Sequence, residues 1–197
     1  MPKPKVIKKR LTPRIDAVSV LYSVDNQPLE NWDTKVRNGH IKRIHDEELQ
    51  CMVLQLKGAM LDTTYITTPS FPKNELNMSL PILVLVIKNV NEPVSFEIQV
   101  VDGTGIRRRF RLGTGFTEMN LKPYTCALPL KLQPGWNYLQ INLPDILWKS
   151  YGTAYSETSR VMIHPNCLLQ RIYFCDRICA PEQMPKEFKS YSAYCTP

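Results

Sequence analysis

Residues 79–112 constrain the fold more than any other part of the chain, because they contain three consecutive β-strand patterns. Residues 80–89 are almost continuously apolar, which is typical of a strand buried on both faces. Residues 96–100 alternate apolar and polar side chains, as expected for a half-buried strand. A turn at residues 102–105 then leads into a returning strand over residues 106–112.

The register of the last two strands follows from the need to bury one apolar face. A one-residue slip turns every side chain of a strand to the other face, so an even-numbered loop would place apolar side chains opposite arginines. We therefore predict a loop of three or five residues with a glycine in the left-handed conformation. Arg107, Arg109 and Arg111 would then share one exposed face, beside Glu97 and Gln99 of the partner strand. The predicted buried face contains Phe96, Ile98, Val100, Ile106, Phe110 and Leu112.

Short strand patterns and turn signals continue on both sides of this stretch. Pro144 and Asp145 suit a first helical turn and Gly152 suits the position after a last turn, so one short helix is predicted over residues 144–151. About ten short strands with one helix indicate an all-β fold, an antiparallel β-sandwich of the jelly-roll type. The further strands are predicted over residues 17–24, 51–57, 63–67, 125–132, 136–143, 160–164 and 168–176.

Length and charge indicate one folded domain with two terminal extensions. The 197 residues can form a single core, so we predict a β-sandwich domain over residues 15–180, a basic leader over 1–14 and a C-terminal tail over 181–197. The leader accounts for +6 of the net charge of +7, and the nearly neutral remainder argues against nucleic-acid binding. No apolar run has the length of a membrane span and no signal-peptide pattern is present, so we expect an intracellular protein without a membrane partner.

The sequence lacks the common catalytic and cofactor motifs. G-x-S-x-G, the P-loop, H-E-x-x-H and the glycine-rich dinucleotide turn do not occur, so no enzymatic activity and no cofactor are expected. The three tryptophans occur in contexts that favour packing over a platform for stacking sugars. No C-x-x-C pair occurs, so we predict reduced thiols and no metal site. The cysteines are Cys51, Cys126, Cys167, Cys175, Cys179 and Cys195.

A second basic feature surrounds the tight-turn signal Asn38-Gly39. It is the densest basic cluster outside the leader, and it is followed by the acidic residues 46–48. The cluster therefore has two interpretations, a partner-binding surface or a surface neutralised by its own acids. Its members are Lys35, Arg37, His40, Lys42 and Arg43.

Several stretches resemble the cilia- and flagella-associated protein 20 family, also called the basal-body up-regulated gene 22 family. The most specific is residues 35–44, Lys-Val-Arg-Asn-Gly-His-Ile-Lys-Arg-Ile, and the resemblance extends over residues 21–189. The leader, residues 113–121 and the C-terminal cysteines depart from the family pattern, which favours a divergent paralogue such as a sperm-flagellum form. The stretches are residues 32–44, 64–67, 107–111, 135–137, 151–153 and 171–174.

The resemblance implies a β-sandwich similar to a carbohydrate-binding module, without enzymatic activity. It implies a location in the axoneme, at the inner junction that joins the A- and B-tubules of doublet microtubules. The implied partners are tubulin, a junction protein like the parkin co-regulated gene product, and other lumenal microtubule proteins. Basal-body and nuclear locations are further expectations from the family.

Three functions follow from these observations. The first is a structural microtubule-junction protein, because tubulin is acidic and guanidinium groups on a rigid strand suit carboxylate partners. The alternatives are a nucleic-acid-associated nuclear factor and a glycan-binding module. For the first function, the expected partner-binding residues are Lys35, Arg37, His40, Lys42, Arg43, Arg107, Arg109 and Arg111.

Overall fold

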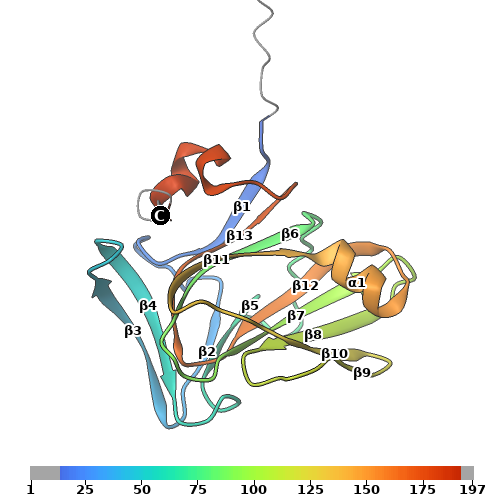
Figure 1. The fold of residues 1–197 in the computed structure, drawn as a ribbon, viewed down its shortest axis with the longest axis horizontal. Coiled ribbons are helices and arrows are strands. Elements are labelled where there is room, and N and C mark those ends of the chain that lie inside the picture. Colours follow the sequence, from blue (N-terminus) through green and yellow to red (C-terminus); the bar gives the residue numbers. More distant parts are fainter. Residues whose placement is uncertain (1–13, 192–197) are drawn as a thin grey trace, which may run out of the picture.

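The computed structural model describes residues 14–191, which form a sandwich of two β-sheets (Figure 1). Sheet A has the strand order β11-β6-β13-β4-β3, with β1 also paired to β13, and sheet B has the order β2-β5-β12-β7-β8-β10-β9. Sheet A consists of β1 (Ala17–Tyr22), β3 (Gly39–Asp46), β4 (Cys51–Gly58), β6 (Ile82–Asn89), β11 (Gly135–Asn142) and β13 (Cys167–Cys175). Sheet B consists of β2 (Asp33–Lys35), β5 (Tyr65–Thr68), β7 (Ser95–Asp102), β8 (Arg107–Gly113), β9 (Asn120–Leu121), β10 (Thr125–Pro129) and β12 (Tyr155–Ile163).

The predicted all-β sandwich with one short helix is confirmed. The strand pairs in the described residues are antiparallel except for β8 and β10, which run parallel. The helix α1 (Leu143–Tyr151) lies at one end of the sandwich, on the right in Figure 1. No helix in the described part of the chain is long and apolar enough to cross a membrane.

Strand β6 is buried on both faces, as its apolar run predicts. Leu83 and Leu85 face the central core between the sheets, whereas Val84 faces a smaller cluster on the outer side of sheet A. That outer side is covered by the segment after β13, which forms two 3-10 helices, η1 (Pro181–Gln183) and η2 (Lys186–Tyr191). A strand with apolar neighbours on both sides needs no polar alternation, which explains its sequence.

The predicted register of β7 and β8 is confirmed. Phe110 pairs with Ile98 and both are fully buried, while Arg111 pairs with Glu97. The loop at residues 103–105 contains Gly105 at φ 82°, because this turn requires a left-handed residue.

The predicted burial of Ile106 is wrong. The first residue of β8 whose side chain points toward the core is Arg108. Ile106 lies at the base of the loop, before β8 begins, and is 38% exposed. Arg108 pairs with the buried Val100, and its guanidinium lies 4.4 Å from the centre of the Tyr151 ring. Arg108 Nε also lies 3.2 Å from Oδ2 of the buried Asp102, so an ion pair stacked on an aromatic ring closes this end of the core.

The helix α1 begins and ends as the sequence predicts. The Asn142 side chain accepts a hydrogen bond from the Asp145 backbone N–H at 3.1 Å, and Gly152 at φ 65° donates to the Trp148 carbonyl. Leu147 is buried against the sandwich, whereas Trp148 points outward with 64% of its surface exposed.

Two short connections with typical turn residues join different sheets. Residues 133–135 lead from β10 in sheet B to β11 in sheet A, and Pro165-Asn166 leads from β12 in sheet B to β13 in sheet A. Turn residues mark where a strand ends, but they carry no information about whether the next strand pairs with it or crosses the core. These turn residues therefore do not determine which strands pair.

Candidate partner-binding surface

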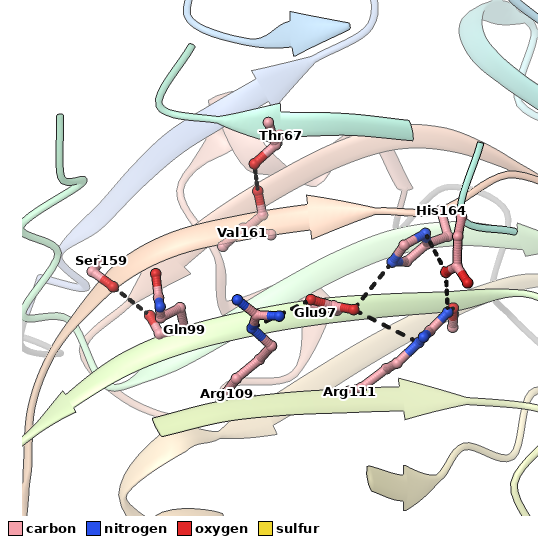
Figure 2. A network of polar contacts seen from close by, with 10 residues as sticks. Thr67, Glu97, Gln99, Arg109, Arg111, Ser159, Val161 and His164 are labelled. Atoms are coloured by element: carbon pink, nitrogen blue, oxygen red, sulfur yellow. Dashed lines mark hydrogen bonds and ion pairs between the residues drawn. The ribbon is translucent and has the colours of Figure 1, made fainter. Parts of the chain in front are cut away.

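The outer face of sheet B collects charged side chains from three neighbouring strands. Alternation along β7, β8 and β12 turns their core residues inward, so the intervening side chains point out together (Figure 2). We call this surface the arginine face. It consists of Glu97, Gln99, Arg107, Arg109, Arg111, Arg160 and Met162.

Glu97 lies at the centre of the arginine face and is only 16% exposed. Its Oε2 lies 3.7 Å from Arg109 Nε, and its Oε1 lies 3.7 Å from Arg111 Nε and 3.5 Å from His164 Nε2. Burial would raise the pKa of Glu97, but the contact with His164 and the charges of Arg109 and Arg111 lower it below its ordinary value. Glu97 is therefore ionised at neutral pH and neutralises part of the arginine face.

Arg107, Arg109 and Arg111, which β8 contributes to the arginine face, differ in how much of their charge is already paired. Arg111 Nη2 donates to Asp62 Oδ1 at 2.7 Å, and Arg107 forms an ion pair with Glu75. Within the described part of the chain, the Arg109 side chain makes no hydrogen bond and only the long contact with Glu97. Of the three, Arg109 consequently has the most hydrogen-bond donors left for a partner.

Arg160 belongs to the same face, although no sequence motif distinguishes it from other arginines. Its guanidinium donates to the carbonyls of Pro69 at 2.8 Å and Asn74 at 2.9 Å, and to those of Phe71 and Pro72 at 3.2 Å. No carboxylate of the described residues lies within 4.0 Å of it. The carbonyls hold the guanidinium in place and leave its positive charge uncompensated.

The other predicted basic cluster is contiguous in sequence but divided in space. Lys35 lies on β2 and faces the same side of sheet B as the arginine face, roughly 19 Å from β8 at the usual strand spacing. His40, Lys42 and Arg43 lie on β3, at an edge of sheet A. Arg37 lies in the connection between these two strands. The eight predicted residues therefore do not form one surface.

The acidic residues that follow this cluster do not neutralise it. Asp46 and Glu48 both pair with Lys88, at 2.9 and 2.6 Å, and Asp46 Oδ1 also accepts from Trp136 Nε1 at 3.1 Å. His40 Nε2 lies 2.9 Å from the Gln55 side-chain oxygen. The exposed Lys42 has no ion pair within the part of the chain that the structure covers.

The described cysteines are free thiols, and all but Cys51 are buried. Burial raises the pKa of Cys167 to about 12 and that of Cys175 to about 11, so these thiols stay protonated. Among residues 14–191, no three His, Cys, Asp or Glu side chains are grouped so that they could hold a metal ion. Cys195 lies outside the described residues.

The three tryptophans lie in different surroundings and do not form a common platform. Trp32 belongs to the central core, Trp136 packs on the outer side of sheet A, and Trp148 is exposed on α1. This arrangement gives no support to stacking of a sugar by all three rings.

Comparison with known proteins decides the family. The sequence profile of the CFA20 domain matches residues 9–192. The chain belongs to the CFA20 domain family. It is 49% identical to the cilia- and flagella-associated protein 20 of Chlamydomonas reinhardtii over 174 residues, which are 88% of this chain and 92% of that protein. The Paramecium tetraurelia protein of the same name is 45% identical over 88% of this chain and 91% of its own length.

The solved structures that this CFA20 domain chain matches are distant in sequence. The family 11 carbohydrate-binding module of a Clostridium thermocellum cellulosomal cellulase is 11% identical, with a TM-score of 0.36 over 81% of this chain and 94% of that module. A C. thermocellum xylanase fragment with CBM22-1 and GH10 modules is 6% identical, with a TM-score of 0.38 over 82% of this chain and 29% of that fragment. The family resemblance predicted from the sequence is confirmed by the profile and by the relatives.

Proposed function

We propose that this protein is a structural, non-enzymatic, microtubule-associated component of the ciliary or flagellar axoneme. The observation that carries the proposal is the 49% identity to a cilia- and flagella-associated protein 20 over 88% of the chain, because that length includes both sheets of the sandwich. Within the axoneme, the proposed position is the inner junction between the A- and B-tubules of the doublet microtubules. The proposed partners are tubulin, a junction protein like the parkin co-regulated gene product, and other lumenal proteins.

The arginine face suits this role physically. Its guanidinium groups project from paired strands, and their planar forks match the geometry of a carboxylate. Tubulin offers acidic side chains at a regular repeat along the microtubule. Weak contacts repeated along such a filament act together, so each single contact can be modest.

The arginine face is less suited to nucleic acid. Glu97, Asp62 and Glu75 lie among its arginines, and a phosphate backbone passing over the face would meet these carboxylates. A nuclear, nucleic-acid-associated role is therefore the alternative that the localisation experiment tests. Basal-body and sperm-specific locations are read out in the same experiment.

The proposal is tested by imaging the tagged, full-length protein in ciliated cells. We expect signal along the axoneme that survives detergent extraction, because a junction protein stays bound to the doublets when the membrane and soluble matrix are removed. A signal confined to the nucleus, or an axonemal signal lost on extraction, would contradict the proposal. A tagged Phe110→Ala variant, in which the core is truncated, controls for association of unfolded protein.

A further inference from the structure

A small cavity opens between three strands of the arginine face. It has a volume of about 70 Å³ and is lined by Glu97 and Gln99 of β7, Arg109 of β8, and Arg160 and Met162 of β12. A cavity of this size has room for a small polar group, such as a carboxylate. Figure 2 shows Arg109, Glu97 and Gln99 side by side on this surface.

The lining of the cavity carries an excess of positive charge. Arg109 and Arg160 contribute two positive charges, and Glu97 contributes one negative charge. The charge of Glu97 is also shared with Arg111 and with the imidazole of His164. An anion entering the cavity is therefore attracted by the net charge of its walls.

The lining also offers hydrogen-bond donors. The guanidinium of Arg109 makes no hydrogen bond within residues 14–188, and neither does the side-chain amide of Gln99, whose backbone carbonyl accepts from Ser159 Oγ at 3.1 Å. Both nitrogens Nη1 and Nη2 of Arg160 already donate to loop carbonyls, so Arg160 supplies charge. Met162 supplies an apolar wall against which the methylene group of a ligand side chain can pack.

We propose that this cavity is a receptor for a single carboxylate, the side chain of an aspartate or glutamate on an acidic protein partner. Arg109 donates to the carboxylate through its forked N–H groups, Gln99 adds its amide, and Arg160 adds its charge. The identity of the partner rests on the proposed function, whereas binding of a carboxylate by the cavity does not. The three carboxylates around the arginine face disfavour a polyphosphate ligand and leave a protein side chain as the occupant.

Arg107, Arg109 and Arg111 lie on the same face of β8, but the proposal gives them different roles. Arg107 and Arg111 hold Glu75 and Asp62 and stabilise the surface, while Arg109 binds the partner. Arg107→Gln and Arg109→Gln remove the same charge from the same face of the same strand, so they form a matched pair of variants.

The test uses a ten-residue peptide with a single glutamate among uncharged residues as the probe, at low salt, with the full-length protein. Binding is measured by calorimetry and by the shift of each arginine Nε–H signal in NMR spectra, after thermal melts show that each variant is folded. We expect Arg109→Gln to weaken binding at least tenfold and Arg107→Gln less than threefold, with the largest shift at Arg109. Equal losses in both variants, no loss in Arg109→Gln, or no binding of the peptide by the wild-type protein would overturn the proposal.

A second measurement separates this proposal from the proposed function. Axonemal incorporation of the Arg109→Gln variant is compared with that of the wild type in the same cells. Normal incorporation of the variant would remove the cavity from the junction contact and leave the proposed function intact. Absence of the wild-type protein from the axoneme would contradict the proposed function, and the peptide experiment would still decide whether the cavity binds a carboxylate.

Discussion

The carboxylate of Glu97 lies 3.5 Å from the imidazole of His164, with Oε1 facing Nε2 (Figure 2). His164 Nδ1 donates to the Leu61 carbonyl at 2.7 Å, so the ring is held in place from both sides. The same carboxylate contacts Arg109 and Arg111, which makes Glu97 the acid that holds the arginine face together.

Replacing Glu97 by glutamine should destabilise the protein by about 1–3 kcal/mol, because it removes the negative charge that lies against the buried Arg111 Nε and the buried His164 imidazole. The effect should depend on pH. The pKa of Glu97 is lowered from 4.5 in the folded protein, so its stabilisation is fully present above about pH 4.5 and is lost as the pH falls through the folded value. Urea titrations of wild type and Glu97→Gln between pH 3 and 7 measure this, and a difference independent of pH would contradict it.

The ion pair between Arg108 and Asp102 should contribute more to the free energy of unfolding than the exposed ion pair of the adjacent Arg107. The Arg108 side chain is 12% exposed and that of Asp102 is fully buried, and removing one partner of a buried pair costs about 3–5 kcal/mol. Arg108→Gln should therefore lower the free energy of unfolding by about 3 kcal/mol. Arg107→Gln is the matched control on the adjacent, exposed position and should change it by about 0.5 kcal/mol or less. Equal effects in the two variants would show that the pair is not structural.

The register of β7 and β8 predicts a large loss of stability when one apolar residue of this region is truncated and a small loss when another is. Phe110 is fully buried between the sheets, so Phe110→Ala should cost about 3–5 kcal/mol. Ile106 is 38% exposed, so Ile106→Ala should cost about 1 kcal/mol or less. Chemical denaturation of both variants measures the difference, and a larger loss for Ile106→Ala would show that the strand pairing is wrong.

The described cysteines should behave as structural thiols. Burial raises the pKa of Cys167 to about 12, so it should react with iodoacetamide at pH 8 only after unfolding. A zinc chelator should leave the melting temperature unchanged. If the cysteines bound a structural zinc ion, removing that ion would lower the melting temperature, because zinc binding contributes directly to folding. Peptide mass spectrometry locates the alkylated cysteines, and rapid modification of Cys167 in the native protein would contradict this assignment.

The sequence was most informative where the structure is local. Alternation along residues 96–112 predicts an odd-numbered loop, apolar side chains opposite one another and Arg109 on the face opposite to Phe110, because the period of two belongs to the strand itself. It was least informative about Arg160, whose place on the arginine face depends on pairing between β12 and β7, far apart in the chain. Arg108 was missed for the same reason, since its aromatic neighbour Tyr151 comes from a distant helix.

The basic cluster shows a different limit of sequence reasoning. Lys35 and Lys42 are close in sequence and share one charge pattern, yet the chain passes from sheet B to sheet A between them. The basic residues that are contiguous in sequence therefore lie on two separate small surfaces. Only Lys35 faces the same side as Arg109.

The most direct test of the account is electron cryotomography of doublet microtubules from cells in which this protein carries a fluorescent-protein tag. We expect additional density at the inner junction between the A- and B-tubules, repeating along the doublet, in averages from tagged but not untagged cells. Additional density at another site of the doublet, or none on doublets that contain the tagged protein, would contradict the proposed function.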